Sequence, residues 1–199
     1  MDLIIIAGMP ATGKTTLSKK VAEAFGYPIL EKDEIKEALF DTVGYRDLSE
    51  KRQLDKAATA VLMQTGEKLM KSGCSLIMVN NFESTMSDAV QGMVDRCGCR
   101  TVTVFLDGDP EVLYARYVAR DAQKLRHLRH TFIDRYPPQP GDPLGLPMTR
   151  QYFADRFEKE GMADFKLNAP AIRVDATHPE KVEVTALIRA VRQALEEQK

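Results

Sequence analysis

Residues 8–15 have the types and spacing that are needed to bind phosphate. The pattern G-x-x-x-x-G-K-[ST] is matched without a substitution by Gly8, Gly13, Lys14 and Thr15. The glycines let successive N–H groups point at an anion, Lys14 would neutralise charge on the β- and γ-phosphates, and the Thr15 hydroxyl would ligate Mg²⁺. We therefore predict a site for ATP and Mg²⁺ made by Gly8, Met9, Pro10, Ala11, Thr12, Gly13, Lys14, Thr15 and Thr16.

The segments on either side of this loop support the match. Residues 3–7 form a short apolar run rich in β-branched side chains, which is typical of a buried parallel strand. Apolar residues then recur at helical spacing along residues 14–25, and Gly26 is placed to end that helix. A glycine-containing turn can fit the pattern by chance, but a strand, a turn and a helix in this order favour a nucleotide-binding loop.

Asp33 is the candidate catalytic base. It follows a second short strand, expected at residues 27–30, and opens the next helix. In parallel α/β sheets ligands bind beyond the carboxyl ends of the strands, where a carboxylate can accept the proton of a hydroxyl that attacks the γ-phosphate. Asp is also a common helix N-cap, and one residue can serve both roles. We favour the catalytic interpretation.

Asn80 occupies a position where an acidic residue would be expected. It follows a third strand, expected at residues 74–79, and nucleotide-binding folds often place a Mg²⁺-organising acid at this point. An amide can hydrogen-bond a metal-bound water but brings no charge. Three interpretations stay open: Asn80 contributes to the metal site with Glu83 supplying the charge, Asn80 and Asn81 hold the acceptor, or the segment is only a polar turn.

Arginines accumulate after the fourth expected strand, residues 101–106. Arg116 and Arg120 lie one turn apart on the helix that follows, and Arg126 comes soon after them. A solvated basic face is one explanation, but clustered arginines in a nucleotide-binding chain favour a phosphate clamp with a catalytic role. The proline-rich segment 136–147 interrupts the periodicity. We expect a lid or acceptor flap at about residues 121–148 of a single domain, residues 1–199.

The composition limits the classes of partner. The 199 residues include 28 basic and 29 acidic side chains, so the chain lacks the broad positive charge that favours nucleic acid. Three cysteines without metal-ligand spacing indicate reduced thiols, and no apolar run is long enough to span a membrane. We expect a cytoplasmic protein whose partners are ATP, ADP and a small molecule that accepts phosphate through a hydroxyl.

Strands and helices alternate along the whole chain. With a fifth strand at residues 171–175, the pattern predicts an α/β fold with a doubly wound, five-stranded parallel sheet. We expect Ser49 to cap a helix that ends near residue 72, and Ser84 to begin a helix that ends near residue 96. We expect Thr149 to cap a further helix and Pro179 to begin the last helix of the chain. Val61 and Val112 are expected on buried helix faces.

Four of these segments resemble a known group of enzymes. The phosphate loop, residues 32–36, 113–120 and 174–179 are similar to segments of the small P-loop kinases related to nucleoside monophosphate kinases. Within that group the chain looks like the branch that contains chloramphenicol phosphotransferase, zeta toxins, gluconate kinase and the polynucleotide kinase domain. The resemblance implies a P-loop NTPase fold with an arginine-containing lid. It also implies that Asp33 is the base, that Arg116 and Arg120 touch the nucleotide or the transferring phosphoryl, and that Thr177, His178 and Pro179 border the adenine.

Three functions are compatible with these features. The favoured one is an ATP- and Mg²⁺-dependent transfer of the γ-phosphoryl to a small-molecule hydroxyl that Asp33 deprotonates. A polynucleotide 5′-hydroxyl kinase would use the same residues, but it needs a basic and aromatic groove, and the chain has no Trp and a net charge of -1. A nucleotide-dependent binding or switch protein with little catalysis is the third, because Asn80 departs from the Asp that is frequent in the resembled group.

Overall fold

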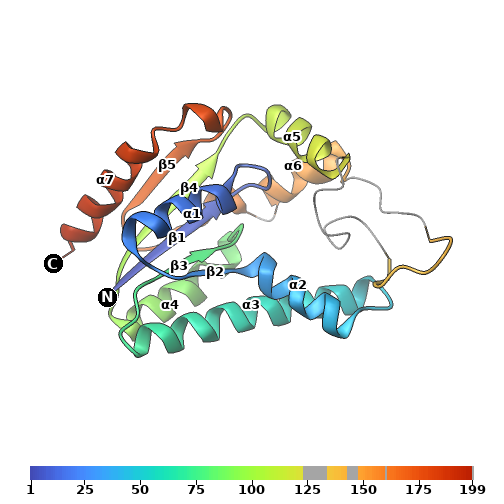
Figure 1. Ribbon diagram of the computed structural model, residues 1–199, viewed down its shortest axis with the longest axis horizontal. Helices are drawn as coiled ribbons and strands as arrows, with labels where there is room; N and C mark the ends of the chain where they lie inside the picture. The colour runs from blue at the N-terminus through green and yellow to red at the C-terminus, as the bar shows by residue number, and fades with distance from the viewer. Residues whose placement is uncertain (123–133, 143–147, 160, 199) are drawn as a thin grey trace.

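A parallel sheet forms the centre of the molecule. The computed structural model describes residues 1–122, 134–142, 148–159 and 161–198. Its five strands lie in the order β2-β3-β1-β4-β5, and each neighbouring pair is parallel (Figure 1). This arrangement confirms the predicted doubly wound α/β fold. The strands are β1 (Asp2–Gly8), β2 (Ile29–Glu31), β3 (Leu76–Val79), β4 (Arg100–Asp107) and β5 (Ala171–Asp175).

Helices cover both faces of the sheet. The α-helices are α1 (Lys14–Phe25), α2 (Lys32–Val43), α3 (Leu48–Lys71), α4 (Ser87–Cys97), α5 (Pro110–Ala122), α6 (Arg150–Lys159) and α7 (Val184–Glu196). The described residues also form the short 3₁₀ helices η1 (Ser84–Met86), η3 (Met162–Asp164) and η4 (Pro179–Lys181). In the part of the chain that the structure describes, no helix combines the length and the apolar character needed to cross a membrane.

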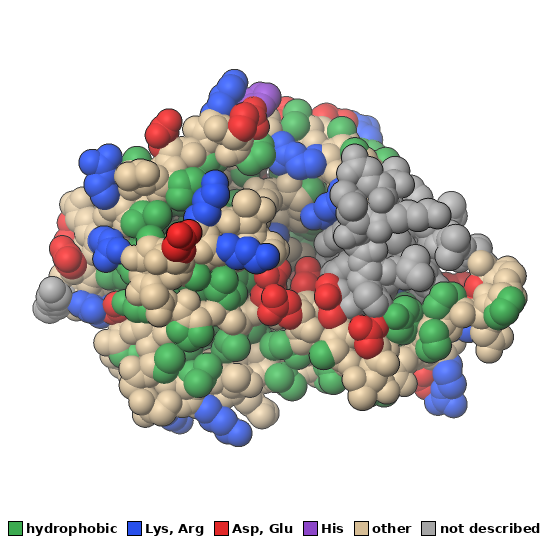
Figure 2. Space-filling view, in the orientation of Figure 1, with side chains coloured by type: hydrophobic (Ala, Val, Ile, Leu, Met, Phe, Trp, Pro, Cys, Tyr) green, Lys and Arg blue, Asp and Glu red, His purple; other side chains and the backbone are tan. Residues whose placement is uncertain are grey.

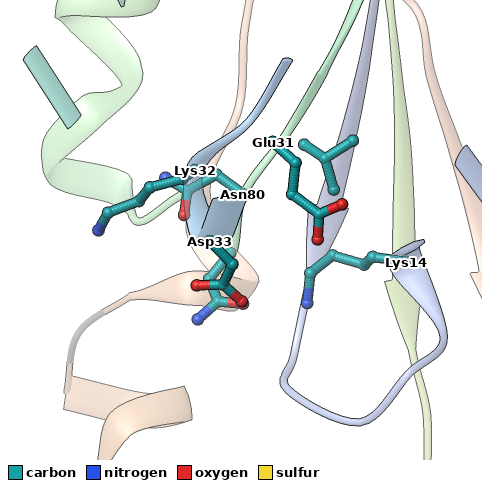
Figure 3. Close-up of a pocket in the computed structure, with 7 residues that line it drawn as sticks. Lys14, Glu31, Lys32, Asp33 and Asn80 are labelled. Carbon is teal, nitrogen blue, oxygen red and sulfur yellow. The ribbon is translucent and has the colours of Figure 1, made fainter. Parts of the chain in front are cut away.

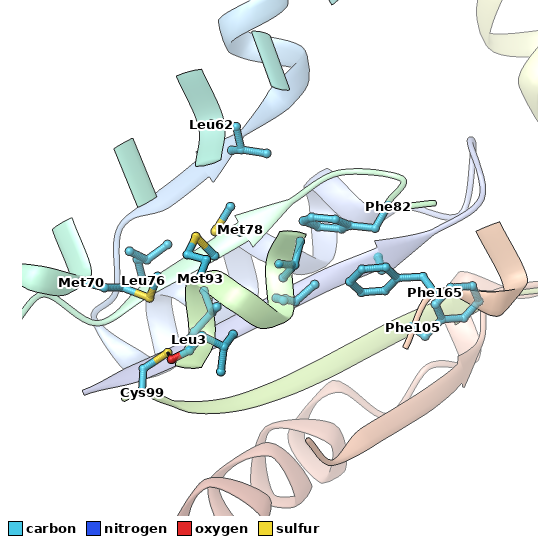
Figure 4. Close-up of a cluster of buried hydrophobic side chains, with 14 residues drawn as sticks. Leu3, Leu62, Met70, Leu76, Met78, Phe82, Met93, Cys99, Phe105 and Phe165 are labelled. Carbon is cyan, nitrogen blue, oxygen red and sulfur yellow. Dashed lines mark hydrogen bonds between the residues drawn. The ribbon is translucent and has the colours of Figure 1, made fainter. Parts of the chain in front are cut away.

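The central strand β1 divides the core into two layers because its side chains alternate between the two faces of the sheet. Leu3 and Ile5 pack against buried residues of α3 and α4, such as Leu62 (Figure 4). Ile4 and Ile6 face the other way and pack against α1 and α7. All of these β1 side chains are fully buried. The strand that leads into the phosphate loop is therefore held from both sides.

A third buried cluster supports the phosphate loop itself. Met9 and Ala11, two of the variable positions in the loop pattern, pack against Leu113 and Tyr117 of α5 and against Phe153 of α6. Met9 is fully buried, so its side chain turns into the protein while the loop backbone stays at the end of the sheet. The position of the loop consequently depends on the helices that follow β4.

The segment 134–142 docks on the end of α2. The N–H groups of Tyr45 and Tyr136 each donate a hydrogen bond to the carbonyl of the other residue, both at 2.8 Å, and their rings stack with centroids 6.1 Å apart. The Tyr136 hydroxyl also donates to Asp41 Oδ1 at 2.9 Å. Residues 123–133 and 143–147 of the predicted lid lie outside the described residues.

Several local expectations need correction. Asp47, and not Ser49, caps α3, because its carboxylate accepts the N–H of Glu50 at 2.9 Å. The segment predicted to begin a helix at Ser84 begins with η1, and Pro179 opens η4 while α7 begins only at Val184. Val61 and Val112 are 43% and 37% exposed, because the buried stripes of α3 and α5 pass through neighbouring positions. Thr149 does cap α6, accepting the Tyr152 N–H at 3.2 Å.

Candidate active site

The backbone of the phosphate loop needs glycine at its first position. Gly8 has φ +130°, and a Cβ added there would lie 2.0 Å from the carbonyl oxygen of Leu106 on β4. Gly13 has φ +88° and forms the N-cap of α1 without a side-chain hydrogen bond. Ala11 also has a positive φ, +65°, which is unfavourable for a residue with a Cβ. The surrounding contacts must therefore hold the loop in its curled conformation.

Three hydrogen bonds hold the phosphate loop in its curled conformation. The Thr12 hydroxyl donates to the Met9 carbonyl at 2.8 Å within the loop. The carbonyl of Asn81, just beyond β3, accepts the Gly8 N–H at 3.2 Å. The Arg116 guanidinium donates to the Ala11 carbonyl at 2.9 Å, so a residue of α5 holds the strained part of the loop. Neighbouring elements and the loop itself thus fix its shape in advance of any ligand.

Lys14 lies across the loop that precedes it. Its amine donates to the carbonyls of Gly8 at 2.9 Å and Met9 at 2.7 Å. These carbonyl contacts keep the charge beside the loop backbone. Thr15 and Thr16, in the first turn of α1, are exposed. The predicted phosphate-binding residues are thus together at the start of α1.

Glu31 is a site residue that sequence reasoning missed. It ends β2 and is buried, and the Thr15 hydroxyl donates to its Oε1 at 2.7 Å. Burial raises the pKa of Glu31 above its ordinary value, and the hydrogen bond from Thr15 opposes that rise. The position of Glu31 in the sequence could have indicated its place in the site, because it is a carboxylate at the carboxyl end of a parallel strand, two residues before Asp33.

Strand register brings these groups to one edge of the sheet. Glu31 of β2 lies beside Val79 of β3, and Val79 lies beside Ile6 of β1. The ends of β2 and β3 are therefore level with the end of β1, where the phosphate loop begins. A pocket opens at this edge (Figure 3). It is lined by Lys14, Glu31, Lys32, Asp33, Val79, Asn80 and Asn81. The candidate base and the phosphate-loop lysine, which are far apart in the sequence, therefore share one pocket.

The first turn of α2 gives the pocket an acidic wall. Asp33 lies in that turn and lines the pocket, whereas its neighbour Glu34 is exposed and is not among the lining residues. Figure 2 shows acidic side chains gathered over this part of the surface. Glu31 is the N-cap residue of the same helix. Carboxylates near a helix N-terminus are stabilised by the helix dipole and its unpaired N–H groups. The start of α2 is therefore a favourable place for the negative charge of a carboxylate.

Asn80 lines the pocket, and its amide is turned toward a sulfur atom. Its Nδ2 lies 3.7 Å from Sδ of Met86, a weak hydrogen bond. The backbone N–H of Asn80 donates a hydrogen bond to the carbonyl oxygen of Ile6 at 3.3 Å. Phe82, two residues further on, is buried with φ +48° and stacks on Phe165, with ring centroids 5.0 Å apart. The chain after β3 is thus held in a strained turn beside the pocket.

Arg116 joins the phosphate loop to the segment after β5. Besides Ala11, it donates to the carbonyls of Ala176 at 3.1 Å and Thr177 at 2.7 Å. All three acceptors are backbone oxygens. The geometry therefore makes Arg116 a clasp between two segments. One is the predicted phosphate loop, and the other is the segment that the family resemblance implies borders the adenine.

The remaining predicted residues occupy the following places. Thr177 accepts the Asp109 N–H at 2.8 Å through its hydroxyl and leads into the exposed His178 and Pro179. The Arg120 guanidinium lies over the ring of Tyr117, 5.8 Å from its centroid. Arg126 lies outside the described residues. Arg116 and Arg120 thus lie on α5, and the Thr177 segment lies on the same side of the phosphate loop as that helix.

The fold and the phosphate loop define a P-loop protein of the kinase type, and comparisons with known proteins agree. The chain belongs to the family described as AAA domain, whose model matches residues 3–133. A proposed kinase from Chloroflexus aurantiacus j-10-fl is 31% identical, with a TM-score of 0.79 and 97% of each chain covered. No curated protein matches the sequence.

More distant structures share the fold. A gluconokinase from Sinorhizobium meliloti 1021 has 17% identity and a TM-score of 0.58 over 98% of this chain and 92% of that one. A shikimate kinase from Bacteroides thetaiotaomicron has 17% identity and a TM-score of 0.55 over 98% of both chains. These two structures show the shared fold, and together with the relative that is 31% identical they confirm the resemblance to the small P-loop kinases.

Proposed function

We propose that this protein transfers the γ-phosphoryl of ATP to a hydroxyl of a small-molecule acceptor. The observation that carries the proposal is the shared pocket of Lys14 and Asp33 at the carboxyl edge of the sheet. One residue belongs to a phosphate-binding loop and the other is a carboxylate at the start of the next helix. Phosphoryl transfer requires one group that stabilises the charge on the phosphates and another that positions the nucleophile, and both groups must contact the same bound substrates.

Nucleotide binding would use the curled loop and the start of α1. The loop N–H groups and the helix N-terminus attract phosphate oxygens, and the Lys14 amine would exchange its contacts with Gly8 and Met9 for the β- and γ-phosphates. The clasp made by Arg116 would keep the loop and the Thr177 segment at a constant separation. The base of ATP would lie near Thr177, His178 and Pro179.

The residues around Thr15 suit a magnesium ion. The Thr15 hydroxyl uses its proton to bond Glu31, which leaves its oxygen lone pairs for a cation. Thr15 and the buried Glu31 carboxylate provide the oxygen donors that Mg²⁺ prefers, and Asn80 at the same edge can bond a metal-bound water. Bound Mg²⁺ would supply charge neutralisation to the β- and γ-phosphates. Glu31 thus brings the negative charge that Asn80 lacks.

Asp33 would prepare the acceptor. Its carboxylate accepts the proton of the attacking hydroxyl as the oxygen approaches the γ-phosphorus, and the bond to the β-phosphate oxygen breaks to release ADP. Lys14 stabilises the charge that develops on the transferring oxygens. Because Asp33 lies in the first turn of α2, the helix fixes its direction relative to Lys14.

The test is ADP release with ATP and Mg²⁺ in the presence of a panel of hydroxyl compounds. We expect one acceptor class to stimulate turnover in the parent protein, and Asp33→Asn to reduce this stimulated rate by roughly 10²–10⁴-fold. Glu34→Gln is the matched control, since Glu34 lies in the same turn of α2 but is exposed. Stimulated turnover that survives Asp33→Asn would show that Asp33 is not the base.

Asn80 favours one second candidate, a nucleotide-dependent switch with little catalysis, because the end of β3 carries an amide in place of an acid. Such a protein would bind Mg²⁺ and ATP tightly, change the exposure of residues 134–142, and release no ADP with any acceptor. The same panel separates the two candidates when ATP binding is measured beside turnover.

A further inference from the structure

Strand β5 forms one edge of the five-stranded sheet and lies beside α7 (Figure 1). Near the start of β5, the Thr103 N–H donates a hydrogen bond to the Pro170 carbonyl at 2.9 Å. Just past its end, the Ala176 N–H donates to the Asp107 carbonyl at 2.7 Å. Main-chain groups alternate in direction along a parallel strand, so the even-numbered residues between these two bonds also pair with β4. The odd-numbered residues of β5 therefore direct their N–H and C=O groups away from the sheet.

The outward main-chain groups belong to Ala171, Arg173 and Asp175, and all three residues are exposed. In the part of the chain that the structure describes, no strand lies on the outer side of β5. A row of outward N–H and C=O groups is a template on which another strand can add to a sheet. This edge of the sheet can therefore accept one more strand.

An apolar groove lies between β5 and α7. Ile172 and Val174 belong to the core layer on the α7 side of the sheet, but they are only partly buried there. The apolar lining of the groove consists of Ile172, Val174, Val182, Ala186, Leu187 and Ala190, together with three charged residues. A strand that paired with β5 would bring its own side chains to this groove and cover it.

Two opposite charges lie along the same edge. The Arg173 guanidinium donates to the Ala163 carbonyl at 3.3 Å and lies 3.7 Å from the Asp107 carboxylate, yet 61% of its side chain is exposed. The Asp175 carboxylate accepts the Thr177 N–H at 2.8 Å and is also exposed. Arg173 and Asp175 are two positions apart, so they share the face of the sheet opposite to the groove. Each charge is thus accessible to a partner.

We infer that the strand added to β5 is the β5 strand of a second copy of this chain, antiparallel to it and related by a two-fold axis at Val174. Outward main-chain groups must meet outward groups, so odd-numbered residues face odd-numbered residues. In this register Arg173 of each copy faces Asp175 of the other, and the charge pair forms twice. Moving the axis by one residue either way would set Arg173 against Arg173 or Asp175 against Asp175, and like charges directly opposite are unfavourable.

The same register joins the two apolar grooves. Val174 of each copy faces Val174 of the other on the α7 side of the sheet, so the grooves meet at the axis. The two five-stranded sheets become one continuous sheet across the dimer. This contact involves neither the phosphate loop nor Asp33, and it is therefore independent of the proposed function.

Sedimentation velocity over a range of protein concentrations tests the dimer and its register. Arg173→Glu sets two acids against each other and Asp175→Lys sets two bases against each other, so each variant alone should raise the dimer dissociation constant about tenfold or more. An equimolar mixture of the two variants restores both charge pairs in a mixed dimer. We expect this mixture to associate nearly as well as the parent protein.

Two further variants complete the set. Ala186→Glu places a charge in the groove without changing β5, and it should also weaken the dimer. Arg52→Glu is the control for charge reversal, because Arg52 is exposed on α3, which packs near the opposite edge of the sheet. We expect it to dimerise like the parent protein. Thermal unfolding of each variant shows whether a loss of association reflects a loss of folding.

Hydrogen exchange locates the contact at the main chain. The Arg173 and Asp175 amides of the parent protein should exchange more slowly above the dimer dissociation constant than below it. The Ile172 and Val174 amides bond to β4 in both states, so their rates should change little.

Three results would overturn the inference. The first is a parent protein that stays monomeric at every concentration, in which case the charges of β5 would protect a bare edge or serve a different partner. The second is a dimer that both single variants leave intact, because its interface would then lie elsewhere. The third is a mixture of the two variants that associates no better than either alone, because Arg173 would then not face Asp175.

Discussion

Replacement of Arg116 separates two roles that the residue could have. The resemblance to small P-loop kinases implies contact with the nucleotide or the phosphoryl group, whereas the structure shows three hydrogen bonds to backbone carbonyls of two segments. A net contribution of ~1 kcal/mol for each bond gives about 3 kcal/mol for the clasp. For a chain of this size that loss corresponds to a fall in Tm of roughly 6–12 °C.

We expect Arg116→Met to lower Tm by this amount and to weaken Mg²⁺-ATP binding about tenfold, because Ala11 and Thr177 lose their common partner. Arg116→Lys should behave similarly, since a single amine cannot span carbonyls on both segments. Differential scanning calorimetry and an ATP titration measure the two effects. Arg189→Met, at an exposed arginine of α7, is the control for loss of charge.

Two outcomes would refute this reasoning. If Arg116→Lys kept the parent stability and ATP affinity, one positive charge would suffice and the multiple carbonyl contacts would not matter. If Arg116→Met kept the parent Tm but lost stimulated turnover by about a hundredfold or more, Arg116 would act on the transferring phosphoryl group.

Three further predictions concern stability and order. Gly8→Ala should abolish ATP binding and lower Tm, because its Cβ would meet the Leu106 carbonyl at 2.0 Å; calorimetry and ATP titration measure this. Asp55 should stabilise the fold above its ordinary pKa of 3.8 and lose that effect as the pH falls through its folded value of about 2. Because 37% of the Asp55 side chain, which pairs with Lys32 and Lys36, is exposed, we expect its contribution to the free energy of unfolding to be about 1 kcal/mol. In the Asp55→Asn protein, urea unfolding should therefore depend less on pH between 4 and 2 than in the parent protein. Gly44→Ala should release segment 134–142, because Gly44 has φ +70° and its Cβ would lie 2.6 Å from the Tyr136 carbonyl; the Tyr136 amide should then exchange hydrogen faster.

Each of these predictions has a contradicting result. Normal ATP affinity in Gly8→Ala would mean that β1 and β4 can separate without harm to the loop. An unchanged pH dependence in Asp55→Asn would mean that solvent screens its pairs with Lys32 and Lys36. Equal exchange of the Tyr136 amide in the parent and Gly44→Ala proteins would mean that the bridge to Tyr45 is not formed stably in solution.

The sequence was sufficient for features that depend on near neighbours in the chain. The phosphate loop could be predicted because its glycines, Lys14 and Thr15 lie within eight consecutive residues, and the flanking strand and helix follow from local periodicity. The helix caps were predicted less well. Asp47 and Ser49 are both good N-cap residues, and only the backbone conformation of Asp47 decided between them.

Tertiary structure decided which distant groups meet at the site. Thr15 and Glu31 are 16 positions apart, and Arg116 is 105 positions from Ala11, so neither contact has a local signature. Strand order placed β3 between β1 and β2, and this register brought Glu31, Asn80 and the phosphate loop to one edge.

The same division applies to the protein as a whole. By itself the sequence determined the phosphate-loop pattern, a parallel α/β fold and the place of Asp33 after the second strand, because each follows from residue type and local spacing. Only the packing of α2 against α3 gathered Lys32, Lys36 and Asp55, and only α5 brought Arg116 to the loop. Burial and charge pairing across the fold depend on contacts between segments far apart in the chain, and a one-dimensional pattern does not contain them.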